Sequence, residues 1–142
     1  MIITTEVPTT IATPNVFVDL LGTYSVHNLT HFDNPANGQL RHLGDSPREF
    51  RIFISSILEC TANDEVELKI VVWDNSESVF VDFKSVRRVI NNLQGGRNVA
   101  FVNVIDGIIL DQNDYVKIQV ANINAINPIT VEVDSEFVVE AR

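Results

Sequence analysis

Apolar and polar residues alternate one by one along several stretches of this chain. The stretches 49–58 and 66–73 both show this pattern, and in the first of them Phe50 and Ile52 flank the polar Arg51. Successive side chains of a β-strand point to opposite faces, so a period of two is typical of a strand with one buried face. A helix needs a period near 3.6 instead. The alternation therefore predicts strands.

Turn-forming residues separate these stretches, among them Asn37-Gly38 and the segment 111–114. Val and Ile together number 35, against 7 Ala and 9 Leu, and β-branched side chains favour strands over helices. Roughly eight to ten short strands with frequent turns indicate an all-β, antiparallel two-sheet sandwich or a barrel. Residues 86–93 suit either a strand or a short helix. The other expected strands are 16–21, 39–43, 49–58, 66–73, 79–83, 99–110, 115–121, 129–133 and 136–140.

The first fourteen residues differ from the rest in composition. They are rich in Thr, and Pro8 and Pro14 favour an extended backbone over a helix. We expect residues 1–14 to form an extended N-terminal arm and residues 15–142 to form the single β-domain. An extended arm can add a strand to the sheet edge of a neighbouring subunit. The arm residues expected to bind such a partner are apolar: Ile2, Ile3, Val7 and Ile11.

Charge and hydropathy exclude two classes of partner. The formal net charge is −9, with 19 acidic and 10 basic residues, whereas nucleic-acid binding depends on Lys and Arg that neutralise phosphate. No apolar run approaches the roughly 18 residues of a membrane span. The N-terminus also lacks the basic flank and apolar core of a signal peptide. We expect neither nucleic acid nor membrane as a partner.

No residue pattern indicates a catalytic or metal site. His27 and His31 are spaced as HxxxH, but Asn34 and Pro35 follow closely, and the helix that would align the two rings is not expected. Cys60 is alone, so it forms no disulfide within the chain. We therefore expect no catalytic residues, no metal and no cofactor.

Two acidic pairs keep other interpretations open. Asp111 and Asp114 in the turn DQND either shape the backbone or hold a calcium ion, although the DxDxDG spacing is missing. The interpretation as an enzyme rests on Asp64, Glu65 and His31. We favour the architectural interpretation of the turn.

The most specific pattern lies in the last third of the chain, in AFVNVIDGIILDQNDYVKIQVAN and ITVEVDSEFVVEAR. An apolar strand ends in Leu110, a turn ends in Asp114, and a last apolar strand contains Phe137. This order resembles the end of tumour-necrosis-factor and C1q-type jelly rolls, which typically carry L-x-x-G-D at that turn. Here Asn113 replaces the glycine, and Asn also accepts positive φ. The resemblance covers residues 99–142 well, 49–93 loosely and the first 48 poorly.

The resemblance implies an antiparallel two-sheet jelly roll that assembles as a threefold trimer. Residues expected at the trimer contact are Phe101, Tyr115 and Phe137. A short, acidic, cysteine-poor jelly roll is also similar to small bacteriophage virion proteins. This implies a homotrimeric capsid decoration (cement) protein that binds the major capsid protein, stabilises the phage capsid, and is located on the virion after assembly in the host cytoplasm.

A different class of function remains open beside this one. The chain could be a receptor-binding or carbohydrate-binding jelly-roll module of a phage tail fibre. In that interpretation Tyr24, Trp73 and Tyr115 provide rings on which a sugar stacks.

Overall fold

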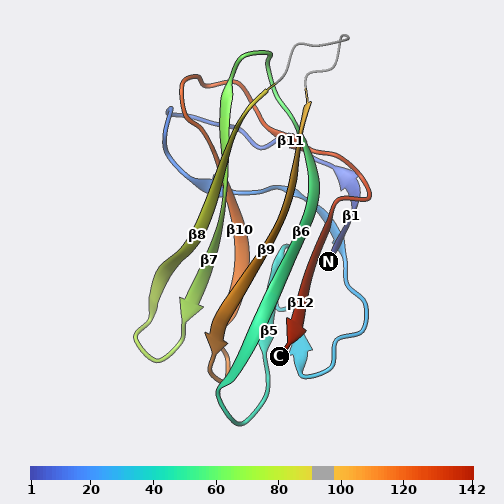
Figure 1. The fold of residues 1–142 in the computed structure, drawn as a ribbon, viewed down its shortest axis with the longest axis vertical. Helices are drawn as coiled ribbons and strands as arrows, with labels where there is room; N and C mark the ends of the chain where they lie inside the picture. The colour runs from blue at the N-terminus through green and yellow to red at the C-terminus, as the bar shows by residue number, and fades with distance from the viewer. Residues whose placement is uncertain (91–97) are drawn as a thin grey trace.

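The computed structural model describes residues 1–90 and 98–142 and shows strands joined by turns and loops (Figure 1). The strands are β1 (Ile2–Glu6), β2 (Val18–Asp19), β3 (Gly22–Ser25), β4 (Phe32–Asp33), β5 (Gln39–His42), β6 (Arg48–Glu59), β7 (Glu65–Asp74), β8 (Val79–Val89), β9 (Asn98–Leu110), β10 (Tyr115–Asn122), β11 (Thr130–Val131) and β12 (Glu136–Ala141). All nine stretches predicted as strands overlap observed strands. Within the described residues, no helix is long and apolar enough to cross a membrane.

Two six-stranded sheets make up the molecule. The first has the order β9–β6–β12–β1–β3, with β11 pairing β6 as well. The second has the order β4–β5–β10–β7–β8, with β2 also pairing β10. All of these pairings are antiparallel, and most join strands that are far apart in the sequence. This arrangement confirms the predicted antiparallel two-sheet sandwich.

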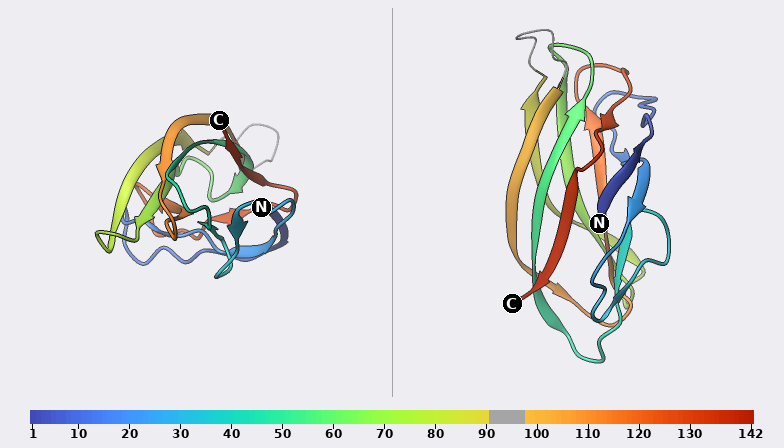
Figure 2. Two further views of the ribbon diagram at one scale, coloured as in Figure 1. Left: turned by 90° about the horizontal axis from the view of Figure 1, so that it is seen from below. Right: turned by 90° about the vertical axis from the view of Figure 1, so that its right-hand side faces the viewer.

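The core lies between the two sheets, which face each other when the molecule is seen from its end (Figure 2). Alternation explains its composition, because every second residue of a long strand points inward. In β6, Phe50, Ile52 and Ile54 are each 2 % exposed, while the intervening residues are half-buried or exposed. We call the face of a sheet that points away from the other sheet its outward face.

The N-terminal segment lies elsewhere than predicted. It is extended, but β1 pairs with β12 and β3 of its own chain rather than projecting as an arm. Ile3 and Ile11 are buried in the core, and Thr9 forms a bridge to Ile129. The apolar residues in the segment bury enough surface to hold it in the sandwich despite the two prolines.

The turn between β9 and β10 has the geometry that the sequence indicated. Asn113 adopts a φ of 71°, the left-handed conformation expected where the family motif has glycine. The buried Asp114 carboxylate accepts hydrogen bonds from the backbone N–H groups of Asn75 and Asp111, each at 2.9 Å. The acid therefore fixes the turn and ties it to the turn after β7.

Strand β8 is longer than expected. Residues 79–83 and 86–89 belong to one continuous strand, so a helix beginning at Val86 is wrong. Each residue of β7 from Glu65 to Asp74 has a partner in β8, with a register shift between Ile70 and Val71, and this pairing overrides the helical spacing of the valines. Residues 91–97 lie outside the described residues, and with them the end of the stretch 86–93 and the turn that we expect at Gln94-Gly95-Gly96.

Candidate functional site

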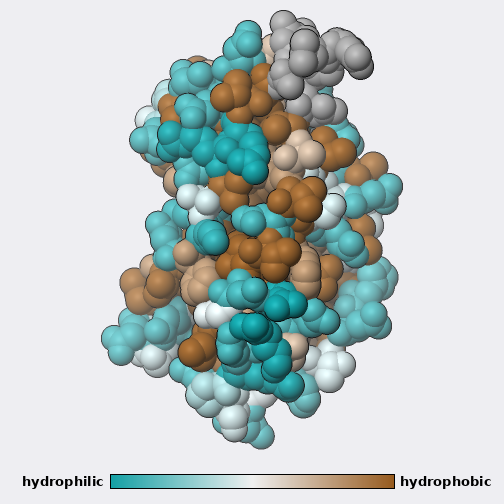
Figure 3. Space-filling view, in the orientation of Figure 1, coloured by the Kyte–Doolittle hydropathy of each residue, from teal (hydrophilic) through white to brown (hydrophobic). Residues whose placement is uncertain are grey.

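Apolar side chains gather on the outward face of β9, β6 and β12. The register aligns Val104, Phe53 and Val138 in one row across these three strands. Val102 and Ile57 lie on the same face, 73 % and 39 % exposed. Figure 3 views this sheet from outside and shows brown, hydrophobic residues near its middle. We call these five residues the outward patch.

One ion pair and two acidic residues lie beside the outward patch. Arg51 donates a hydrogen bond to Asp106 across β6 and β9. That hydrogen bond lowers the pKa of the Asp106 carboxyl and raises the pKa of Arg51. Glu136 and Glu140 lie on the same face of β12. An apolar centre with a charged rim is the usual composition of a protein interface.

A second exposed apolar surface lies along β8, the end strand of the other sheet. Val79 and Val81 lie opposite the β7 residues Asp74 and Val72. Val72 is buried, so Val81 points to the core side of its sheet, yet it is 44 % exposed, and Val79 is 48 % exposed. Phe83 is 38 % exposed. We call these three residues, Val79, Val81 and Phe83, the β8 edge.

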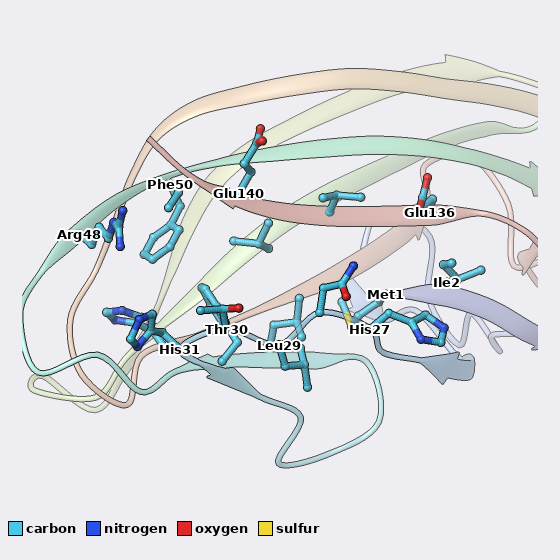
Figure 4. A pocket seen from close by; sticks show the side chains of 17 residues that line it. Met1, Ile2, His27, Leu29, Thr30, His31, Arg48, Phe50, Glu136 and Glu140 are labelled. Carbon is cyan, nitrogen blue, oxygen red and sulfur yellow. The ribbon is translucent and has the colours of Figure 1, made fainter.

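A groove of about 530 Å³ opens beside β12 (Figure 4). Its inner surface includes the buried Leu40 and Phe50, and the loop before β4 contributes Leu29 to its wall. The chain's three histidines all line it: His27, His31 and His42. His27 and His31 lie in the loop between β3 and β4, whereas His42 ends β5, so their spacing in the sequence does not indicate that all three meet.

The groove histidines have different environments. His42 is buried, packs against Phe32 and Phe50 at ring-centroid distances of 5.5 and 5.1 Å, and has its Nδ1 3.2 Å from the Asp111 carbonyl oxygen. His27 shares a 3.0 Å hydrogen bond with the Ser25 hydroxyl. In the described part of the chain, no three His, Cys, Asp or Glu side chains are placed to hold a metal ion.

Three aromatic rings meet on the outward face of the second sheet. Trp73 and Tyr115 lie parallel at 6.0 Å, and Phe80 packs edge-on against both. The Lys117 ammonium lies 4.2 Å from the centre of the Phe80 ring. Burial raises the pKa of Tyr115. The structure thus brings together two of the three predicted stacking residues.

The third, Tyr24, lies elsewhere. It belongs to β3 in the first sheet, its ring packs 6.5 Å from Phe137, and its hydroxyl donates to the Leu20 carbonyl. Burial raises its pKa strongly. Tyr24 is therefore a packing residue and does not extend the aromatic cluster.

The other residues predicted to contact a partner are buried to different degrees. Phe101 and Phe137 are each 1 % exposed and pack in the core of their own chain, which leaves little of either ring for a second chain. Their role at a trimer contact stays a prediction. Of the residues predicted for a binding arm, Ile3 and Ile11 are buried, whereas Ile2 and Val7 are half-buried.

The residues of the enzyme interpretation lie in different environments, and Asp64 belongs to a buried network of side chains. The Asp64 carboxylate accepts hydrogen bonds from Asn122 at 2.7 Å, Asn127 at 2.9 Å and the Cys60 thiol at 3.3 Å. Burial and Asp64 together raise the pKa of Cys60 to about 12. His31 lies in the groove instead, in a different loop from Asp64. The side chains of Asp64, Glu65 and His31 are therefore not assembled as one catalytic group.

Comparison with known proteins identifies the fold. No protein-family model matches the chain, and no curated protein sequence does. The solved structure of Eiger TNF from S. frugiperda is similar, with a TM-score of 0.62, 5 % identity, and coverage of 96 % of this chain and 89 % of that one. The chain has a TNF-like jelly-roll fold.

Murine APRIL is also similar. Its structure at pH 5.0 gives a TM-score of 0.52 with 9 % identity, covering 94 % of this chain and 98 % of that one. The structure at pH 8.0 gives a TM-score of 0.52 and 9 % identity, with 95 % of both chains covered. At such identities the likeness concerns the jelly-roll sandwich itself.

Proposed function

We propose that this chain assembles as a homotrimer in which the β8 edge of each subunit packs on the outward patch of the next. The observation that carries the proposal is the pair of exposed apolar surfaces on different sides of one TNF-like jelly roll. Contact between unlike surfaces is head-to-tail, and it closes into a ring when the rotation between subunits allows. Burying Val81 and Val104 would remove apolar surface from water.

We further propose that the trimer is a structural virion protein, a decoration protein that binds the major capsid protein on the surface of a phage capsid. The proposal is supported by the short acidic chain, the compact jelly roll, the use of Asp114 to hold the backbone of a turn, and the use of Asp64 in a buried side-chain network. An antibody raised to the chain should label the shells of purified virions from its source. Labelled tails with unlabelled shells would contradict a capsid location.

The mass of the assembly tests the trimer. Light scattering coupled to size exclusion should give three times the chain mass of 15.9 kDa. We expect Val104→Asp and Val81→Asp to give monomers, because each places a charge in one of the two contact surfaces. Val16→Asp is the matched control, since Val16 is similarly exposed at 49 % but lies in neither surface.

Mixing the two monomeric variants tests the head-to-tail contact. The Val104→Asp chain keeps its β8 edge and the Val81→Asp chain keeps its outward patch, so an equal mixture should form a one-to-one pair. A mixture that stays monomeric, or a wild-type protein that is itself monomeric, would contradict the proposed contact.

The aromatic cluster favours a second candidate, a carbohydrate-recognition module. Trp73, Phe80 and Tyr115 are adjacent, and aromatic rings commonly form ligand-binding surfaces. Binding on a glycan array should be lost in Trp73→Ala and kept in Tyr24→Phe, because Tyr24 lies in the other sheet. A wild-type protein that binds no glycan would remove this candidate.

A further inference from the structure

The edge of β12 beside the groove carries backbone groups that no strand of the described chain pairs. The Phe137 N–H donates to the Met1 carbonyl at 2.8 Å, and the Met1 ammonium donates to the Phe137 carbonyl at 2.6 Å. Just beyond the end of β12, the Arg142 N–H donates instead to the Glu49 carbonyl of β6, on the other side of the strand. Backbone groups alternate in direction along a strand. Those of Val139 and Ala141 therefore point to the same side as those of Phe137, away from β6.

Strand β1 covers only the first part of this edge. Its single paired position with β12 is Ile2 opposite Glu136. Beyond Phe137 the edge faces the groove, whose lining includes Val139 and Ala141. An unpaired edge of this kind is a template for an added strand.

The groove offers an apolar surface beside the free edge. An added strand would point alternate side chains inward, toward Leu40 and Phe50, and toward Leu29 on the loop wall. Leu29 is 38 % exposed in the structure and would be covered by such a strand. The inward positions of the added strand would therefore carry apolar residues.

The outward positions of an added strand would meet a different chemistry. The exposed Glu140 would be the direct cross-strand neighbour of one outward residue, with Glu136 further along the same face. Opposite charges in such pairs stabilise a sheet, and the whole chain is acidic at −9. Arg48 lines the groove at the end opposite Ile2 and Glu136 (Figure 4), and we assign the basic preference only to the position facing Glu140.

We propose that this groove binds an extended peptide segment of a partner protein, which pairs with β12 as an additional strand. The segment carries apolar residues at alternate positions and Lys or Arg opposite Glu140. The site lies at the β12 edge and uses the backbone, and it adjoins the trimer contact proposed above, because its lining includes Val138 of the outward patch.

A random twelve-residue peptide library displayed on a surface, selected on the full chain, tests this site. Enriched peptides should carry apolar residues at alternate positions and a Lys or Arg at the one outward position that faces Glu140. Leu29→Glu should weaken their binding by at least about tenfold, because it places a charge against the apolar groove. Leu43→Glu is the matched control, since Leu43 is 41 % exposed but does not line the groove. Glu140→Lys should weaken the basic peptides as well.

Hydrogen exchange reports the pairing directly. A selected peptide, added in excess, should slow amide exchange at Val139 and Ala141 on the order of tenfold or more, because their N–H groups become hydrogen-bonded. A library without enriched peptides would overturn the proposal. Equal binding to Leu29→Glu and Leu43→Glu, or unchanged exchange at both amides, would overturn it too.

Discussion

Single residues of the β9–β10 turn show how far a sequence pattern predicts local structure. Asn113 was expected to accept positive φ in place of glycine, and its φ of 71° confirms this. The same reasoning fails to choose between adjacent strand residues. Alternation gives β9 two faces, but Phe101 on one and Val102 on the other are both apolar, so the sequence cannot say which face is buried. We named Phe101 as a contact residue, and the structure exposes Val102.

Replacing Asn113 tests the strain at this turn. Asn113→Ala should lower the free energy of unfolding by about 1 kcal/mol, because a residue with a Cβ and no local polar group is disfavoured at positive φ. Asn113→Gly should be neutral or slightly stabilising, since glycine adopts this conformation freely. Urea unfolding followed by circular dichroism measures both changes. Equal destabilisation by Ala and Gly would show that the Asn side chain, rather than the backbone, matters.

At the scale of elements, strand positions were predictable but their partners were not. The stretch 49–58 was recognised from alternation, yet nothing local indicates that β6 pairs with β9, β12 and β11. The N-terminal segment was misplaced for the same reason. Its prolines are a local signal for an extended chain, whereas its burial depends on distant contacts. Gly22 illustrates this, because a Cβ there would approach the Ile3 Cδ1 to 2.8 Å.

The integration of β1 predicts the effect of truncating its buried residue. Ile3→Ala should lower the free energy of unfolding by about 2–5 kcal/mol, as is usual when a buried Ile side chain is removed from a core. Ile2→Ala on the same strand is the control, and a smaller loss is expected because Ile2 is only half-buried. Urea titration gives both values. Similar small losses at the two positions would indicate that the segment is a loosely attached arm.

For the whole molecule, alternation and composition were enough to predict the class of fold. The candidate surfaces could not be predicted from the sequence, because they depend on which strands lie at the ends of each sheet. Val81 is an example: its β7 partner Val72 is buried, and Val81 is exposed because β8 is the last strand of its sheet. The groove likewise exists because β1 pairs with only the first part of β12. Both features follow from topology and not from local sequence.

The net charge predicts how salt affects the proposed trimer. Each chain carries a formal charge of −9, so assembly brings like charges together, while the assigned contact residues, such as Val81 and Val104, are apolar. Salt shortens the Debye length from about 10 Å at 0.1 M to about 3 Å at 1 M. Screening therefore weakens the repulsion between subunits and leaves the apolar contact in place.

We accordingly expect the trimer to dissociate less when NaCl is raised from about 20 mM to about 500 mM. Sedimentation equilibrium at the two salt concentrations measures the dissociation constant. The Val16→Asp control should respond more steeply than wild type, because it adds one negative charge to each subunit outside the contact. Tighter assembly at low salt would mean that ion pairs such as those near Arg51 hold the subunits together, and that the apolar surfaces assigned to the contact are the wrong ones.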